Sequence, residues 1–402
     1  MKFGGTSVRD LDHIKRAAQK VIREVANGYH VTVVVSAMAG VTNRLVEEAS
    51  SQGFTERDPE YSAIVSEGEL ETSRLMAQSI NEMGHGAQAW SGPQVPIKCD
   101  NNYGQSNILA IPSQNIEDGF KTNQTAVVAG FQGISQEGCI TTLGRGGSDT
   151  TAVALACALG AERCDIYTDV DGVYTADPRQ VKKAQKIDQA AFEEILEMAH
   201  MGSKVLHPRC VQLGMKYNIP IQVLSSLGDG IGSDLEGTMI MDEIETMEGG
   251  AVTGISHDFN DAQLTVYKIK DEFGQAANIL SALSDAQINK DMIIQPVSNG
   301  SGTTPMTLSV PKQDAERAQN ALKALGYGHV EVDTDIVKIS AVGSGMKTDH
   351  TVSTTFFKTL ADNKINTRAI ATSEIKISVI VRADHAETAL TKLHSAFGLD
   401  RK

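Results

Sequence analysis

The sequence predicts an α/β protein with a mainly parallel sheet sandwiched by helices, followed by two smaller modules of β-α-β-β-α-β order. Through roughly the first 225 residues, apolar strand-like runs alternate with helix-like periods, which implies right-handed crossovers and parallel strands. The stretch 225–250 is rich in Ser, Gly, Asp and Glu and has no apolar period, as expected of a linker. Beyond it, the same order of strands and helices can be traced twice.

The expected domain boundaries follow from this pattern. The first domain is expected at 1–228, with Ile219–Leu224 as its last strand, and the linker at 229–250. The first module is expected at 264–335. The second repeat, 336–402, ends without its sixth element, and the strand-like run Ala251–Ser256 can fill that vacancy. The second module is therefore expected to comprise 251–258 together with 336–402.

Composition restricts the class of protein. A length of 402 residues exceeds one usual domain, and 41% hydrophobic residues suffice for real cores. The net charge of −14 argues against nucleic acid or an acidic membrane surface as partner. No run reaches the ~18 apolar residues of a membrane span, and no signal peptide is evident. The five cysteines form no C-x-x-C pair. We expect a cytoplasmic protein with no membrane partner and no dedicated metal site.

A glycine pair near the N-terminus is a candidate phosphate cradle. Gly4 and Gly5 precede a helix pattern over 11–25, and Lys2 supplies a point charge. The pair matches neither a Walker loop nor G-x-G-x-x-G. Only Met1 precedes Lys2, so the first strand is expected to be shortened or absent.

A second glycine-rich loop spans 143–151 and leads into a strong helix signal over Ala152–Leu159. Its glycines allow a ligand to approach the backbone, and a helix N-terminus favours anions. Ser148 is the predicted N-cap, and the Arg145 fork suits a carboxylate or phosphate. Asp149 would repel an anion unless it takes part in the chemistry. By itself this stretch is equally consistent with a glycine-rich turn before a capped helix.

Further polar positions follow predicted strands or open helices. The apolar run Val31–Val35 ends in a loop of small residues, at the edge of the sheet where ligands of open α/β folds bind. Glu69 lies near a helix start, where it could bind an ammonium group or simply favour the helix dipole. The loop after Cys164–Asp169 carries an aromatic ring and an arginine, which suits a nucleotide or an ordinary surface loop.

Taken together, these stretches resemble the aspartokinases, kinases that phosphorylate the side-chain carboxylate of L-aspartate. The segments that carry the resemblance are KFGGTSV (2–8), VVVSAMAGVTNRL (33–45), GE (68–69), TTLGRGGSDTTAVALA (141–156), YTDVDGVYTADPR (167–179), MGSKVLHPR (201–209) and TSEIKISVIV (372–381). They span nearly the whole chain in the family's order. The tail is similar to the family's paired ACT domains, small ferredoxin-like modules that bind amino acids.

The resemblance implies roles for particular residues and implies ATP and Mg²⁺ as cofactors. Lys2 would stabilise the transferring phosphoryl group, and Asp149 would organise Lys2 and the substrate. Arg145 would grip the aspartate carboxylate. The further residues expected to contact aspartate are Ser36, Thr42, Glu69 and Ser148. Those expected to bind ATP, besides Lys2, are Phe3, Gly4, Gly5, Thr168, Asp169, Tyr174, Arg179 and Lys204.

The resemblance also implies that the enzyme belongs to the biosynthetic branch that leads to lysine, threonine and methionine. It implies feedback control through the ACT domains, with threonine and/or lysine as effector. It implies a homo-oligomer formed through these domains. The residues expected to line the effector pocket are Asp271, Gly274, Ala276, Asn289, Asp291, Gln295, Asn366 and Thr367. Two departures from the family pattern, Lys290 and Thr367-Arg368, fall beside this pocket.

Two alternatives stay open at this level. One is another kinase of the same fold that acts on glutamate or acetylglutamate, against which the paired ACT repeats argue. The other is a catalytically impaired amino-acid-sensing homologue, in which the short first strand disables the kinase domain.

Overall fold

The computed structural model describes residues 1–201, 205–242, 250–297, 302–327 and 329–401. The chain divides into two compact units, which we describe separately. Unit 1 comprises Met1–Val173, Lys186–Ala199 and Lys204–Thr246. Unit 2 comprises Tyr174–Gln185, His200–Ser203 and Met247–Lys402. Among the described residues, no helix is long and apolar enough to cross a membrane.

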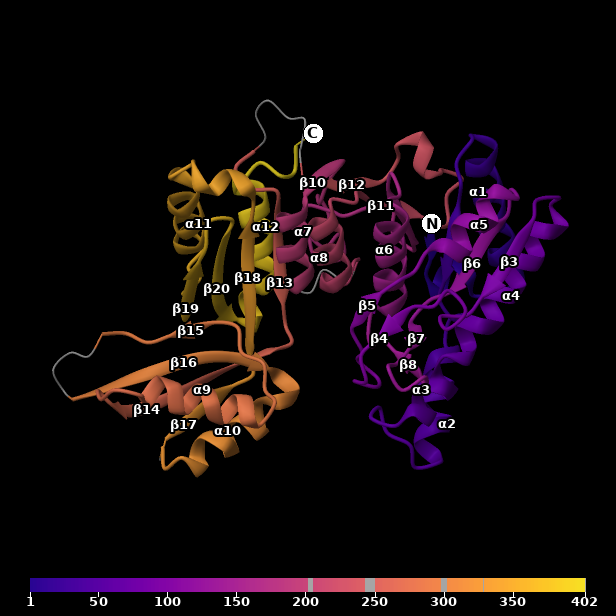
Figure 1. Cartoon of the computed structure of the whole chain (residues 1–402). Coiled ribbons are helices and arrows are strands. Elements are labelled where there is room, and N and C mark those ends of the chain that lie inside the picture. The colour runs from indigo at the N-terminus through magenta and orange to yellow at the C-terminus, as the bar shows by residue number, and fades with distance from the viewer. Residues whose placement is uncertain (202–204, 243–249, 298–301, 328, 402) are drawn as a thin grey trace. The chain divides into compact units, whose positions relative to one another are not determined.

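An eight-stranded sheet forms the centre of unit 1, in the order β10-β12-β11-β9-β1-β2-β6-β3. Figure 1 labels β10, β12, β11, β6 and β3 of this sheet. Neighbouring strands of this sheet pair in parallel, except β11 and β12, which are antiparallel. The prediction of a mainly parallel sheet is confirmed. The strands are β1 (Lys2–Phe3), β2 (Thr32–Val35), β3 (Ala87–Trp90), β6 (Thr125–Ala129), β9 (Cys164–Thr168), β10 (Gln189–Ala191), β11 (Ile221–Ser225) and β12 (Thr238–Met241).

Helices cover both faces of this sheet because its strands are apolar on both faces. Val33 and Val35 of β2 belong to a buried core shared with α1 (Leu11–Ala26) and α4 (Glu67–Glu82). Val34 points the other way, towards α6 (Gly147–Leu159), as strand alternation requires. By the same alternation, the two residues of β1, Lys2 and Phe3, project towards helices on opposite faces of the sheet.

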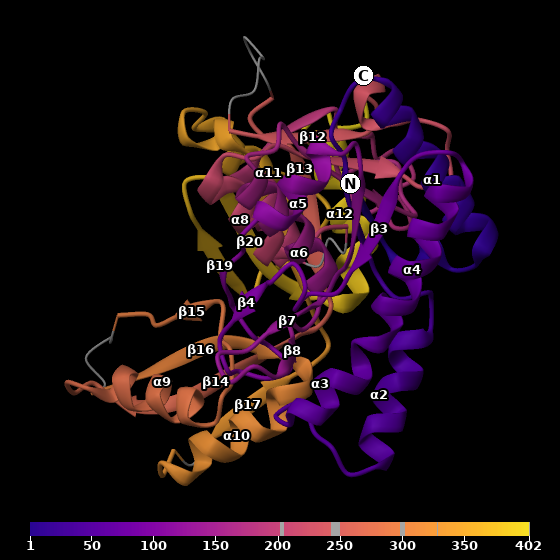
Figure 2. The ribbon, with the colours of Figure 1, turned by 45° about the vertical axis from the view of Figure 1, so that its right-hand side comes forward.

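The remainder of unit 1 consists of peripheral elements. Helices α2 and α3 lie side by side (Figure 2) and share a small apolar cluster. A four-stranded sheet has the order β5-β4-β7-β8. The bounds are α2 (Val41–Ser51), α3 (Pro59–Val65), β4 (Lys98–Cys99), β5 (Ile108–Ala110), α5 (Gln114–Lys121), β7 (Gln132–Ile134), β8 (Ile140–Thr142), α7 (Phe192–His200, whose last residue belongs to unit 2) and α8 (Pro208–Tyr217).

Unit 2 contains two four-stranded antiparallel sheets, β15-β16-β14-β17 and β13-β18-β20-β19, each with its own apolar core. Both orders are those of the ferredoxin-like fold, so the predicted fold class is confirmed. Because β13 pairs with β18, the first sheet is inserted in sequence between two strands of the second. The bounds are β13 (Gly254–Asp258), β14 (Asp261–Lys270), α9 (Gln275–Asp285), β15 (Ile293–Ile294), β16 (Thr303–Pro311), α10 (Ala315–Ala324), β17 (Val330–Asp333), β18 (Ile336–Val342), α11 (Thr351–Asp362), β19 (Ala369–Thr372), β20 (Lys376–Arg382) and α12 (Ala386–Ala396).

Two element predictions were wrong. Ile219–Leu224 is not the last strand of the first domain, because β12 follows it inside the stretch expected to be a linker and pairs with β11. Ser148 is not an N-cap either. Helix α6 begins at Gly147, after Gly146 in the left-handed conformation (φ 69°), and Ser148 lies inside the first turn without a capping hydrogen bond.

Candidate functional site

Lys2 is held at the centre of the sheet although β1 has only two residues. It pairs with Val34 of β2 on one side and Ile166 of β9 on the other. The Lys2 side chain projects towards α6, where its Nζ lies 2.6 Å from Oδ1 of Asp149 in the first turn. Both side chains are largely buried, with 10% and 15% exposure. The pair predicted to be catalytic is thus brought together as a partly desolvated ion pair.

Phe3 points in the opposite direction. Its ring is fully buried in the core beside α1 and α4 and stacks on Tyr167, with the ring centroids 4.7 Å apart. Phe3 can therefore line a phosphate site only through its backbone and not through its side chain. The physical reason is the two-residue period of a strand, which buries Phe3 wherever Lys2 faces α6.

The carboxyl ends of three strands meet beside Lys2. Phe3 pairs with Val35 and Tyr167, so Gly4, Ser36 and Thr168 follow at the same edge of the sheet. A Cβ at Gly4 would lie 3.2 Å from Nζ of Lys2. Any side chain at this position would crowd the ammonium group, so this backbone stays open beside the cation.

The loop before α6 requires glycine at position 146. A Cβ there would lie 2.4 Å from the His207 side chain, besides the positive φ. Arg209 donates to the carbonyl oxygens of Leu143 (2.9 Å) and Ser106 (2.6 Å) and so fixes the start of the same loop. His207 and Arg209 belong to the MGSKVLHPR segment of the sequence, and their part here is structural.

Arg145 at the tip of this loop is exposed. Within the part of the chain that the structure describes, its guanidinium forms no ion pair or hydrogen bond, in contrast to Lys2. A planar fork without an internal partner is available for a carboxylate from solution. Ser148, the second residue of α6, is buried close to Gly130, which directly follows β6.

Glu69 reaches the loop after β2 from the first turn of α4. Its Oε1 accepts a hydrogen bond of 3.0 Å from the backbone N–H of Ala37. Burial raises the pKa of Glu69 to about 7, and the bond from Ala37 opposes this rise. Oε2 is buried without a hydrogen-bond partner among the described residues. Thr42, the second residue of α2, is half-buried.

The residues expected to bind nucleotide are distributed between the two units. In unit 1, Thr168 ends β9 and the exposed Asp169 follows it. The Thr168 hydroxyl donates to the Asp169 carboxylate at 3.1 Å. Tyr174 and Arg179 belong to unit 2. The Arg179 side chain is 86% exposed, and its Nε lies 3.9 Å from the Asp177 carboxylate. Lys204 lies outside the described residues.

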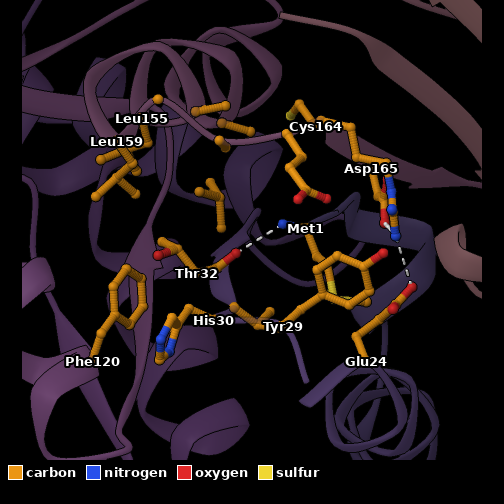
Figure 3. Close-up of a pocket in the computed structure, with 18 of the residues that line it drawn as sticks. Met1, Glu24, Tyr29, His30, Thr32, Phe120, Leu155, Leu159, Cys164 and Asp165 are labelled. Carbon is orange, nitrogen blue, oxygen red and sulfur yellow. Dashed lines mark hydrogen bonds and ion pairs between the residues drawn. The ribbon is translucent and has the colours of Figure 1, made fainter. Parts of the chain in front are cut away.

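A cavity of about 450 Å³ lies at the opposite edge of the same sheet (Figure 3). Its walls include Met1, Thr32 and Cys164, which stand at the amino ends of β1, β2 and β9, together with Leu155 and Leu159 of α6. The Met1 amino group donates to the Thr32 carbonyl at 2.8 Å. No residue of the predicted substrate or nucleotide set lines this cavity, so it is separate from the candidate site.

In unit 2, most of the expected effector residues are exposed, with Ala276 and Thr367 half-buried. Gly274 is the left-handed N-cap of α9 (φ 88°), and the amide of Asp271 donates to Gly302 O at 3.0 Å. The remaining exposed members of the set are Asn289, Asp291, Gln295 and Asn366. Lys290 donates to Ser284 Oγ (2.6 Å) and Leu280 O (3.4 Å) of α9.

Sequence reasoning missed the partner of Asp291. The Lys338 ammonium on β18 is buried and contacts two carboxylates, Asp291 at 2.8 Å and Asp261 at 2.7 Å. The local sequence around Lys338 alternates as an ordinary strand, so no pattern marked a buried lysine there. The carboxylate expected to meet an effector ammonium therefore already has an internal cation beside it.

Comparisons with known proteins identify the family of the chain. The model of the amino acid kinase family matches residues 1–225, and an ACT domain model matches residues 339–397. An aspartate kinase of Pseudomonas fluorescens is 45% identical over 99% of this chain and 97% of its own. An aspartokinase of Corynebacterium glutamicum is 39% identical over 99% and 95%.

Solved structures give the same result at the level of the fold. The structure of E. coli aspartokinase III in complex with aspartate and ADP, described as the R-state, has a TM-score of 0.81 at 27% identity and 98% coverage of both chains. The same enzyme in complex with lysine and aspartate, described as the T-state, has a TM-score of 0.76 at 26% identity and the same coverage. The chain belongs to the aspartate kinases of the amino acid kinase family.

Proposed function

We propose that this aspartate kinase transfers the γ-phosphoryl group of ATP to the side-chain carboxylate of L-aspartate, giving 4-phospho-L-aspartate and ADP. We propose this reaction as the first step of the biosynthetic branch that leads to lysine, threonine and methionine. The observation that carries the proposal is the Lys2–Asp149 ion pair beside the open backbone of Gly4. Phosphoryl transfer requires positioned charge more than covalent chemistry, and this pair supplies a fixed cation.

The proposed roles rest on the resemblance to the aspartokinases and, for Lys2, Asp149 and Glu69, also on their contacts. The Lys2 ammonium neutralises charge that develops on the transferring phosphoryl oxygens, and Asp149 fixes its position. Arg145 binds a carboxylate of aspartate, and Glu69 accepts its ammonium group. Ser36, Thr42 and Ser148 complete the aspartate contacts. The backbone at Phe3, Gly4 and Gly5, with Thr168, Asp169, Tyr174, Arg179 and Lys204, contacts ATP.

Mg²⁺ accompanies ATP in this proposal and neutralises phosphate charge when bound. Among the described residues, no cluster of three or more His, Cys, Asp and Glu side chains is suited to hold a metal ion. The nearby Asp149 carboxylate is already engaged with Lys2. The ion would therefore be held mainly by phosphate oxygens of the nucleotide.

The impaired alternative has no support. It depended on the loss of the first strand, yet β1 pairs on both sides and holds Lys2 against Asp149. A preference for glutamate or acetylglutamate is likewise without a specific observation in its favour, whereas the relatives of 39–45% identity cited above bear the name of aspartate kinase or aspartokinase.

We further propose that unit 2 binds a regulatory amino acid, threonine and/or lysine, and forms a homo-oligomer through its ACT domains. E. coli aspartokinase III has been solved in complex with lysine and aspartate, which supports lysine as the effector proposed for this chain. We also propose three domains: 1–228, extended by β12 and without the loop Tyr174–Gln185 that belongs to unit 2, then 264–335, and finally 251–258 with 336–402. The pairing of β13 with β18 supports the last division.

Product trapping tests the proposed reaction. ADP release is measured with aspartate, glutamate or acetylglutamate as acceptor, with hydroxylamine present to convert an acyl phosphate into a hydroxamate. We expect ADP and hydroxamate in equal amounts with aspartate and neither above background with the other two. ADP release without hydroxamate, or faster turnover of glutamate, would contradict the proposal.

A further inference from the structure

The loop Tyr174–Gln185 belongs to unit 2 and is built into the second ferredoxin-like module. The carbonyl oxygen of Thr175 accepts a hydrogen bond of 2.7 Å from the backbone N–H of Ile255, the second residue of β13. Ala176 and Val181 are buried in the core of this module, together with residues of β18, α11 and α12. The loop is therefore a packed part of the module and not a surface appendage.

One buried polar contact fixes the first turn of this loop. The Thr175 hydroxyl lies 2.8 Å from Nε2 of His394 on α12, and both residues are buried. The same hydroxyl oxygen accepts a bond of 2.9 Å from the N–H of Gln185, and the N–H of Thr175 donates to the Gln185 carbonyl at 2.8 Å. Thr175 thus ties both ends of the loop to each other and to α12.

His394 has no role in the proposed chemistry, yet it is a fully buried polar side chain. Its Nδ1 forms no hydrogen bond within the described residues, so Thr175 is the partner that compensates for the burial of this ring. Burial also lowers the pKa of His394, which disfavours the charged form of the ring. Moving Thr175 away would leave the buried His394 ring without a hydrogen bond, which costs free energy. The contact therefore favours one position of Thr175 and of the loop that carries it.

We infer that His394 is a positioning residue for the nucleotide: through Thr175 it fixes the loop that carries Tyr174 and Arg179. This inference rests on the proposed nucleotide contacts of those two side chains. Tyr174 directly precedes Thr175, and Arg179 lies between the two bonded ends of the loop. Loss of the His394 contact should therefore loosen the loop and weaken ATP binding, with little effect on the aspartate contacts, which come from other elements.

The test compares KM values of the full-length enzyme. His394→Leu should raise KM for ATP about threefold to tenfold, the effect of one lost buried hydrogen bond, and leave KM for aspartate within about twofold. Thr175→Ser, which keeps the hydroxyl, should stay near wild type, whereas Thr175→Val should weaken ATP binding. Adding His394→Leu to Thr175→Val should have little further effect, since both remove the same contact.

Two further variants separate the possible failures. Ser378→Ala removes a buried hydroxyl that bonds to Ser340 at 2.6 Å in the same sheet, and it should lower stability without changing KM for ATP. If His394→Leu behaves like Ser378→Ala, His394 is merely structural and the inference is overturned. Arg179→Ala tests the proposed function itself: an unchanged KM for ATP would remove the nucleotide role of the loop. A raised KM in Arg179→Ala with an unchanged KM in His394→Leu and Thr175→Val would overturn only the positioning role.

Discussion

At the scale of single residues, burial and pairing decide which charges are available to substrates. Lys2 and Asp149 face each other in a partly desolvated pair, whereas Arg145 is exposed without an internal partner. Glu69 is buried with one oxygen satisfied by Ala37 and the other unsatisfied. An unsatisfied buried carboxylate gains most from an incoming ammonium group, which makes Glu69 the residue whose titration should be visible in aspartate binding.

The pH dependence of KM for aspartate follows from the raised pKa of Glu69, about 7. Below this pH the empty enzyme holds a neutral Glu69 that must lose its proton before it can pair with an ammonium group. KM for aspartate should rise by about tenfold per pH unit below pH 7. Steady-state kinetics between pH 6 and 8 measure this, and Glu69→Gln should have a high KM with no such slope. A wild-type KM that stays constant over this range would refute the assignment.

The same titration affects stability with a defined sign. The folded pKa lies above the ordinary value of 4.5, so the contribution is present at low pH and is lost as pH rises through about 7. The free energy of unfolding of the ligand-free enzyme should therefore contain a contribution from Glu69 that falls between about pH 4.5 and pH 7. The Glu69→Gln variant should lack this contribution.

Arg145→Ala should raise KM for aspartate by about tenfold to a hundredfold and KM for ATP much less, because a bidentate contact to a carboxylate is lost. Arg74→Ala, which removes another exposed arginine of unit 1, is the matched control and should change neither. Equal effects of Arg145→Ala on both substrates would indicate that the loop before α6 has collapsed instead.

At the scale of elements, hydrophobic periodicity predicted the strands and helices well, since the strands of unit 1 are apolar runs and the two modules repeat one order. It failed where a boundary depended on backbone conformation or distant pairing. The start of α6 is set by the left-handed Gly146 packed on His207, not by the hydroxyl of Ser148. Strand β12 is a short apolar run, Thr238–Met241, in an otherwise polar stretch, and its pairing with β11 makes it a strand of the sheet.

At the scale of the whole molecule, the chain combines a kinase unit with a unit that contains two ferredoxin-like sheets. The sequence motifs predicted both, because catalytic loops and repeated folds leave local patterns. Charge pairs between distant segments leave none, as the buried Lys338 with Asp261 and Asp291 shows. Such contacts depend on the tertiary fold, so they were accessible only from the structure.

Asp291 offers a test of the proposed regulation. Asp291→Ala removes a carboxylate that an effector ammonium would need, while Lys338 keeps Asp261 as a partner. The effector concentration for half-maximal inhibition should rise at least about fivefold for threonine, or for lysine with threonine, relative to each enzyme's own uninhibited rate. Asp285→Ala, at the exposed end of α9, is the control. Unaltered inhibition curves for Asp291→Ala would mean that the effector binds elsewhere.

The turnover number of Lys2→Ala tests the central claim most directly, that the Lys2–Asp149 pair performs phosphoryl transfer. The lost cation acts mainly in the transition state, so kcat should fall by about 100- to 1000-fold while the protein remains folded by circular dichroism. Lys15→Ala, on the exposed face of α1, should leave kcat near wild type. A folded Lys2→Ala enzyme with unchanged kcat and only a raised KM for ATP would contradict the account.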